Sequence, residues 1–231
     1  MPTIAESIAA VCGRIGAAAE RAGRSAADIQ LVAVSKTHSP EVVREAVAEG
    51  LTVFGESRIQ EAKAKIPELP DKLRWHFIGH LQTNKAREAV ELFHVIQSVD
   101  SIRLARELDQ CAERASRTLA VLLECNVSGE GTKFGFKPDE VTAALAELNS
   151  LPRLEIQGLM TMAPFFKDPQ EARPTFRALR ELRDRLQQQH DIPLPELSMG
   201  MTNDFEIAIE EGATMVRIGT AIFRPVPGAE A

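Results

Sequence analysis

Eight short apolar segments alternate along the chain with longer segments of helical periodicity. Such alternation is typical of repeated βα units around a parallel sheet, because parallel strands need a crossover connection between them. The strand candidates are residues 29–35, 52–54, 75–78, 94–98, 119–126, 154–160, 196–198 and 215–218. Helical segments with polar outer faces lie between them, for example residues 40–48, 102–115, 138–149 and 173–189.

Eight strands of this kind predict a closed (β/α)8 barrel, the TIM barrel, because an open sheet of that length would leave two edges to protect. The 231 residues suit one such domain, which typically takes about 250. We therefore predict a single α/β barrel domain over residues 1–231, with an extra amphipathic N-terminal helix near residues 4–22. An open doubly wound sheet is the alternative, but no G-x-G-x-x-G motif follows the first strand.

Charge and cysteine content exclude several classes of function. The net charge is -6 and the basic residues are scattered, so the basic surface of a nucleic-acid-binding protein is not expected. Cys12, Cys111 and Cys125 lack the spacing of a zinc site or a disulfide framework. The N-terminal residues do not resemble a signal peptide, and no run of about 18 apolar residues occurs. We predict a cytoplasmic protein without a membrane or nucleic-acid partner.

Lys36 closes the first strand candidate, and the working residues of such barrels lie at the C-terminal ends of strands. With a period of two, Lys36 shares a face with Val34 and Val32. If that face is the inner one, the amine lies in the barrel mouth above an apolar layer. Desolvation there lowers a lysine's pKa and supplies the neutral amine that imine formation requires. The alternative is a solvated lysine at a strand end.

The loops after the seventh and eighth strand candidates combine glycines with hydroxyl groups. A helix is expected to begin near Asn203, with Glu206 as its capping-box partner. Its free N–H groups would suit an anion, and phosphate sites in these barrels commonly use these two loops. A well-capped helix in a tight turn is the alternative. Ser198, Thr202 and Thr220 offer hydroxyls to such an anion, and Gly219 permits close approach of the backbone.

Arg217 lies two residues before Gly219 and shares its face of the eighth strand candidate. A permanently charged guanidinium on the inner face of a barrel needs an acceptor. The nitrogen of a pyridine ring whose phosphate lies at Gly219 would meet that need. Because arginine only donates, such a nitrogen stays unprotonated and the ring is a poor electron sink. The alternative is an internal salt bridge, with Glu124 as the partner.

Other polar residues are less specific. His80, just beyond the third strand candidate, could face a bound ring or cap its loop, whereas His76 and His94 are more typical of packed strand residues. Met160 is typical of core or pocket lining. No cluster with the spacing of metal ligands occurs, and no Ser, His and Asp set indicates acyl transfer.

Together these segments resemble the YggS/PROSC family of proteins that bind pyridoxal 5'-phosphate (PLP), across nearly the whole chain. The matching segments are Val-Ala-Val-Ser-Lys-Thr at 32–37, Phe-Gly-Glu at 54–56, Gln-Glu at 60–61, His-Phe-Ile-Gly-His-Leu-Gln-Thr-Asn-Lys at 76–85, Gly-Leu-Met at 158–160, Leu-Ser-Met-Gly-Met at 197–201 and Val-Arg-Ile-Gly-Thr-Ala-Ile-Phe at 216–223. The resemblance implies a fold-type III barrel, like the N-terminal domain of alanine racemase. It also implies a role in PLP homeostasis, with effects on amino-acid and keto-acid balance.

The resemblance also assigns roles to single residues. Lys36 is implied to carry PLP as a Schiff base, and Arg217 to face the pyridine nitrogen. The phosphate is implied to lie among Ser198, Met199, Gly219 and Thr220, with His80, Ser57, Met160 and Thr202 as further cofactor-binding candidates. The chain departs from the family pattern at Ser57 and Arg58, where Asn-Tyr is usual, and at Thr202, where a serine is usual. Phe134 is bulkier than the pattern leads us to expect.

Three functions fit these residues: a PLP carrier without robust turnover, a racemase-like PLP enzyme, and a Schiff-base aldolase. Racemisation in this fold needs a second base, usually a tyrosine from another subunit's added domain. The chain contains no tyrosine and its length leaves no room for that domain. An aldolase has no evident use for Arg217. We therefore favour the carrier, which we expect to be monomeric and to supply apo forms of PLP-dependent enzymes.

Overall fold

The eight apolar segments form strands, and the computed structural model describes residues 2–129 and 134–223. The strands are β1 Gln30–Val34, β2 Val53–Glu56, β3 Arg74–Phe77, β4 Val95–Val99, β5 Leu119–Glu124, β6 Leu154–Met160, β7 Glu196–Ser198 and β8 Met215–Ile218. Each strand pairs in parallel with the next, and β8 pairs with β1, so that the barrel is closed. The predicted (β/α)8 barrel is confirmed.

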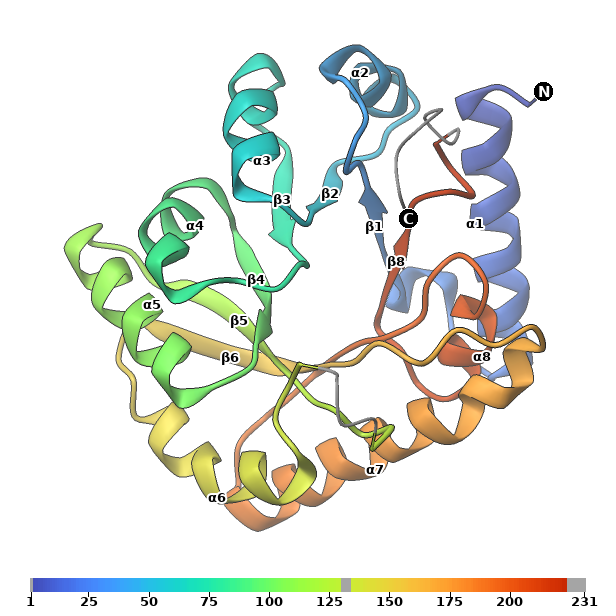
Figure 1. Ribbon diagram of the computed structural model, residues 1–231. Coiled ribbons are helices and arrows are strands. Elements are labelled where there is room, and N and C mark those ends of the chain that lie inside the picture. Colours follow the sequence, from blue (N-terminus) through green and yellow to red (C-terminus); the bar gives the residue numbers. More distant parts are fainter. Residues whose placement is uncertain (1, 130–133, 224–231) are drawn as a thin grey trace.

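Helices follow the strands and surround the barrel (Figure 1). They are α1 Ile4–Arg21, α2 Pro40–Ala48, α3 Ile59–Lys65, α4 Ala86–Leu92, α5 Ile102–Arg114, α6 Pro138–Asn149, α7 Arg173–His190 and α8 Phe205–Glu210. Short 3-10 helices occur at Ala26–Asp28, Ile66–Glu68, Thr83–Lys85 and Pro169–Ala172. Among the described residues, no helix is long and apolar enough to cross a lipid bilayer. The prediction of one domain over residues 1–231 includes residues 1, 130–133 and 224–231, which lie outside the described part.

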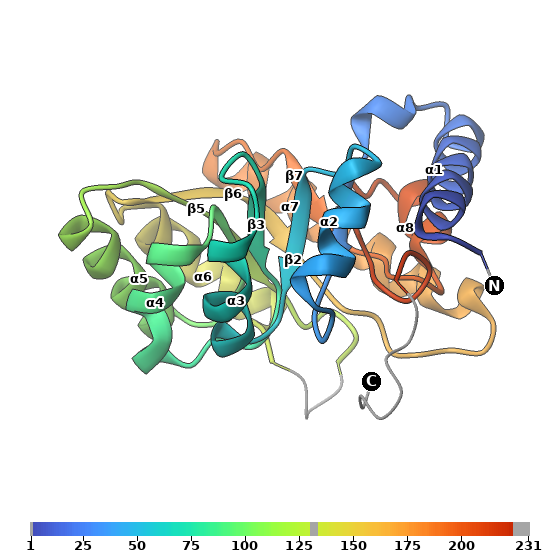
Figure 2. The ribbon, with the colours of Figure 1, turned by 90° about the horizontal axis from the view of Figure 1, so that it is seen from above.

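The predicted extra N-terminal helix is α1, which lies beside α8 on the outside of the barrel (Figures 1 and 2). Thr3 and Glu6 form a capping box at its start, since the Thr3 hydroxyl accepts from the Glu6 backbone N–H and the Glu6 carboxylate accepts from that of Thr3. The Arg14 guanidinium lies 4.5 Å from the centre of the Phe205 ring. Burial of one apolar face and this contact fix the helix against α8.

Strand side chains alternate between two apolar environments. Val121 and Leu123 belong to the main core, which lies between the strands and the helices. Leu122, between them, instead contacts Met160 and Met215 in a separate small cluster. This period of two places the small cluster inside the barrel. Inward and outward positions can therefore be assigned along each strand, which determines which side chains reach the barrel mouth.

Three strands, β1, β3 and β5, end earlier than predicted, and the differences in β1 and β5 bear on the mouth. β1 ends at Val34, because the chain turns at Lys36 and Thr37, where Thr37 adopts a left-handed conformation with φ 66°. β5 ends at Glu124, and Cys125 then forms an isolated parallel bridge with Phe136. Between β6 and β7 the backbones approach so closely that a Cβ atom on Gly158 would lie 1.9 Å from a carbonyl oxygen of Glu196.

Candidate functional site

The Lys36 side chain belongs to a turn at the C-terminal end of β1. Ser35 faces outward, because its hydroxyl donates to Oε1 of the buried Glu56 at 2.7 Å. Val32 and Val34 are buried but lie outside the main core, so they face the barrel interior. Alternation then directs Lys36 to the inner side. Its side chain is exposed, however, so the prediction of an amine desolvated by the protein is wrong, because the strand ends before it.

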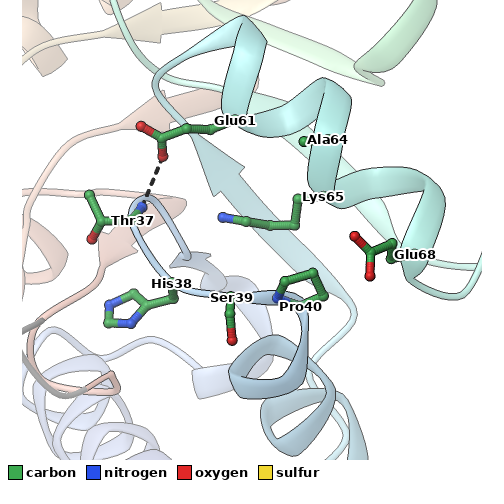
Figure 3. A pocket seen from close by; sticks show the side chains of 8 residues that line it. All are labelled: Thr37, His38, Ser39, Pro40, Glu61, Ala64, Lys65 and Glu68. Carbon is green, nitrogen blue, oxygen red and sulfur yellow. Dashed lines mark hydrogen bonds between the residues drawn. The ribbon is translucent and has the colours of Figure 1, made fainter.

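Helix α3 holds the backbone on both sides of Lys36. The Lys65 ammonium donates to the Ser35 carbonyl oxygen at 2.7 Å, and the Thr37 N–H donates to a Glu61 carboxylate oxygen at 3.0 Å. Figure 3 shows Glu61 and Lys65 reaching from α3 toward this turn, beside a pocket of about 380 Å³. These contacts stabilise the left-handed conformation of Thr37, which is unfavourable for a β-branched residue.

The ion pair between Lys65 and Glu56 lies under the same turn. The two side chains are 6% and 0% exposed, and Nζ lies 2.6 Å from Oε1. Burial raises the pKa of Glu56, and the Lys65 ammonium opposes that rise. The other Glu56 oxygen is buried without a hydrogen-bond partner among the described residues. The pair therefore anchors the turn, but it leaves one carboxylate oxygen unsatisfied.

Arg217 lies on the inner face of β8 and is only 3% exposed. Its guanidinium donates to the Ser198 hydroxyl at 2.6 Å and to the Thr161 carbonyl oxygen at 2.8 Å. Burial lowers the pKa of Arg217 to about 10, and the carboxylates of Glu124 and Asp204 oppose that shift. No ion pair within 4.0 Å joins Arg217 to Glu124 in the described part of the chain, so the salt-bridge alternative is wrong as a direct contact.

A chain of hydrogen bonds continues from Arg217 through the barrel interior. The Ser198 hydroxyl donates to Oε1 of Gln97 at 2.6 Å, and Nε2 of Gln97 lies 2.8 Å from Nδ1 of His76. Since the amide nitrogen donates, Nδ1 accepts. Burial lowers the pKa of His76 to about 3, so the ring is neutral and carries its proton on Nε2, which has no partner among the described residues. The chain fixes the orientation of the Arg217 guanidinium.

Gln97 and His76 were not predicted to support the site. A signal was available in the sequence, since His76 lies between Trp75 and Phe77 and Gln97 follows Val95 and Ile96 in a buried strand. The same geometry bears on Ser198, whose one hydroxyl proton is directed at Gln97. A hydrogen bond from Ser198 to a phosphate would need the same proton. The predicted phosphate contact of Ser198 stays a prediction.

The loops after β7 and β8 meet at the mouth. The hydroxyls of Thr202 and Thr220 lie 3.2 Å apart. Gly219 lies against the end of β1, since a Cβ atom there would be 3.3 Å from the Cβ atom and carbonyl oxygen of Val34. Val34 is two residues before Lys36. The predicted lysine and the predicted phosphate loops therefore lie at the same edge of the barrel.

The start of α8 differs from the prediction. The helix begins at Phe205 and has only six residues, and its N-cap is Asp204. Asn203 donates to the Phe166 carbonyl oxygen, and Glu206 forms an ion pair with Arg14 of α1. The predicted capping box is therefore wrong, because both of its side chains have tertiary partners.

The backbone of this loop bonds within the protein. Met199 is fully buried, and its N–H donates to the Met215 carbonyl oxygen at 3.1 Å. The Met201 N–H donates to Asp204 at 2.7 Å. Gly200 has φ 93°, and a Cβ atom there would lie 2.6 Å from the Ala208 methyl carbon, so only glycine fits. A phosphate contact through Met199 stays a prediction.

His80 lies at the rim of the mouth. Its Nδ1 is 3.2 Å from a carboxylate oxygen of Asp100, and its ring stacks on Phe134 with the ring centres 3.8 Å apart. Ser57 follows β2, and its carbonyl oxygen would be 2.3 Å from a Cβ atom on Gly79. The predicted cofactor contacts of His80 and Ser57 stay predictions. Thr132 and Lys133, beside Phe134, lie outside the described residues.

Met160 forms part of the inner wall, where it contacts Leu122 and Met215. It also pairs with Glu124 on β5 and with Ser198 on β7. No group of three or more histidine, cysteine or carboxylate side chains that could hold a metal occurs within residues 2–129 and 134–223. The described residues at the mouth include Lys36, the buried Arg217, hydroxyl groups and carboxyls.

A family model for the N-terminal domain of alanine racemase matches residues 13–227. A pyridoxal phosphate homeostasis protein of Aquifex aeolicus is 47% identical over 219 residues, which are 94% of this chain and 96% of that protein. This chain belongs to the family of pyridoxal phosphate homeostasis proteins. A pyridoxal phosphate homeostasis protein of Pseudomonas aeruginosa is 45% identical, over 96% of each chain.

Solved structures agree with this assignment. PipY of Synechococcus elongatus PCC7942, solved with PLP bound, is 40% identical with a TM-score of 0.84, and the match covers 96% of this chain and all of PipY. Alanine racemase of Corynebacterium glutamicum has a TM-score of 0.71 at 20% identity, covering 96% of this chain and 63% of the racemase. That likeness concerns the fold alone, and it agrees with the predicted fold-type III barrel.

Proposed function

We propose that this member of the pyridoxal phosphate homeostasis proteins binds PLP in its barrel mouth and takes part in PLP homeostasis by holding the cofactor and supplying it to other enzymes. One observation carries the proposal. Gly219, whose loop contacts the loop after β7, lies against the end of β1, two residues before Lys36. An amine, two loops that carry hydroxyl groups and a buried guanidinium therefore share one end of the barrel.

The residues at the mouth fit PLP by their donor chemistry. Lys36 would bind the aldehyde carbon as a Schiff base, Arg217 would face the pyridine nitrogen, and Gly219, Thr220 and Thr202 would surround the phosphate. Bound PLP supplies an electrophilic carbonyl and, in enzymes, an electron sink. Arg217 only donates, and its remaining hydrogen-bonding capacity suits an unprotonated nitrogen. Such a ring is a poorer electron sink than one whose nitrogen is paired with a carboxylate.

The exposure of Lys36 also supports reversible binding. A lysine that the protein leaves open to solvent can form and release a Schiff base with a free aldehyde without an opening of the fold. The racemase alternative lacks support, because the 231 residues contain no tyrosine to act as the usual second base. We further propose a monomer in the cytoplasm whose partners are apo forms of PLP-dependent enzymes.

The binding test uses purified protein mixed with PLP. We expect a visible absorbance band, and after borohydride reduction we expect peptide mass spectrometry to place the pyridoxyl phosphate group on Lys36. Lys36→Ala should lose both signals. Lys63→Ala is the matched control, since that exposed lysine of α3 pairs with Glu88 at the surface. A wild-type protein that takes up no PLP, or carries it on another lysine, would contradict the proposal.

Delivery needs a separate experiment. PLP-loaded protein is mixed with an apo-enzyme in the presence of an excess of a PLP-trapping protein. Recovery of enzyme activity despite the trap supports direct transfer. Recovery only without the trap means that PLP is released into solution, which leaves sequestration as the function and removes direct supply.

A further inference from the structure

Glu124 is a buried carboxyl at the inner edge of the mouth. It is the last residue of β5 and is 4% exposed. Its neighbour Leu123 faces the outer core and Leu122 the inner cluster, so alternation places Glu124 inside the barrel. Across the sheet it pairs with Met160, which pairs in turn with Ser198, the hydroxyl partner of Arg217. Glu124 and Arg217 therefore approach the same interior space from opposite ends of this row.

The Glu124 carboxylate makes no hydrogen bond or ion pair within residues 2–129 and 134–223. A carboxylate that is largely removed from water and has no protein partner is costly, and native proteins rarely keep one without a functional reason. The Glu124 oxygens are not among the fully buried side-chain atoms without a partner, so they keep some access to solvent at the C-terminal end of β5. The missing partner is therefore expected to be a bound molecule.

The charges around Glu124 come from several elements. Burial raises the pKa of Glu124 to about 7, the nearby Asp100 after β4 adds to the rise, and Arg217 opposes it. Asp100 is itself in contact with His80 of the β3 loop. Asp204 acts on Arg217 from the loop after β7. His76, on β3, is neutral. On its other side Glu124 pairs with the uncharged Met160.

We propose that Glu124 is an acid–base residue that contacts the PLP bound between Lys36 and Arg217. Its carboxyl forms a hydrogen bond with a group of PLP that carries an exchangeable proton. The inference rests on the proposed function and adds a residue to it. At low pH the neutral carboxyl donates a hydrogen bond to the ligand. As the pH rises, the carboxyl loses one proton to solvent, and the carboxylate accepts a hydrogen bond instead. The visible absorbance of bound PLP therefore follows the ionisation of this one carboxyl.

The test is a spectrophotometric pH titration of the PLP-loaded protein. We expect the wild type to show an absorbance transition that is lost in Glu124→Gln, a variant of the same shape that cannot ionise. Glu155→Gln is the control, because this exposed glutamate lies at the opposite end of the neighbouring strand β6 and carries the same charge. Asp100→Asn should keep the transition but move its midpoint to lower pH, since it removes a like charge from beside Glu124.

The outcomes separate this inference from the proposed function. If the wild type and Glu155→Gln take up no PLP on Lys36, both proposals fail. If they take it up and Glu124→Gln shows the same titration, only the role of Glu124 fails. Should Glu124→Gln not fold, the Asp100→Asn arm decides: an unmoved midpoint overturns the inference, and a lowered midpoint supports it.

Discussion

Replacing Glu124 by glutamine should stabilise the PLP-free protein at alkaline pH. Burial raises the pKa of this carboxyl from its ordinary value of 4.5 to about 7. The unfolded chain binds the proton less tightly than the folded protein does. Proton binding by this carboxyl therefore contributes fully to the free energy of unfolding below the pKa that the group has in the unfolded chain. The contribution is lost as the pH rises through the pKa that the group has in the folded protein. The change from 4.5 to about 7 corresponds to about 3 kcal/mol.

The measurement is urea unfolding of wild type and Glu124→Gln at about pH 5 and about pH 8.5. Glutamine does not ionise. From the lower to the higher pH, the free energy of unfolding of Glu124→Gln should therefore rise relative to that of wild type by up to about 3 kcal/mol. In thermal unfolding this is roughly 6–12 °C for a chain of this size. Glu155→Gln, on the exposed end of β6, should show no such change. A Glu124→Gln difference that is equal at both pH values would refute the buried, unpaired state of this carboxyl.

Three further variants test other contacts. Lys65→Met should destabilise the fold by about 3–5 kcal/mol at alkaline pH, because it leaves the Glu56 carboxylate buried without its cation. The loss should shrink toward about pH 5, since the raised pKa of Glu56 lets that carboxyl become neutral; equal losses in urea unfolding at both pH values would contradict this account. Gly158→Ala should lower the melting temperature sharply or prevent soluble expression, because its Cβ atom would overlap a backbone carbonyl of β7, whereas Gly16→Ala, with open space in α1, should be neutral or stabilising. Gln97→Leu should cost about 1–3 kcal/mol in urea unfolding by leaving two buried polar partners unpaired, and an unchanged midpoint would remove the interior hydrogen-bond chain from the description.

The barrel could be predicted because its signal is local and repeated. Each βα unit shows a short apolar segment and then a helical period, so an error at one boundary leaves the count of strands unchanged. Lys36 and Arg217 could be assigned faces of their strands by the same period of two. The sequence put Arg217 on the same face as Gly219, opposite Val216 and Ile218, and the guanidinium lies inside the barrel.

The errors came from contacts between residues far apart in the sequence. Glu206 has the spacing of a capping box, but its carboxylate binds Arg14, 192 residues away, and a local pattern carries no trace of that pair. The burial of Lys36 was overestimated because β1 ends early, where Glu61 of α3 stabilises the turn at Thr37. In each case a tertiary contact overrode a correct local preference.

The protein holds Arg217 and Lys36 in different ways, and this difference supports a carrier. Arg217 is held by the Ser198 hydroxyl and the Thr161 carbonyl oxygen, whereas Lys36 lies on an exposed turn that α3 holds through the backbone of Ser35 and Thr37. A rigid partner for the ring and an accessible amine for the aldehyde favour specific binding together with exchange. An enzyme that stabilises a carbanion needs a proton donor and acceptor pair arranged about its substrate. Within the described residues, Glu124 is a buried carboxyl at this mouth that makes no hydrogen bond or ion pair, and such a single carboxyl does not form that pair.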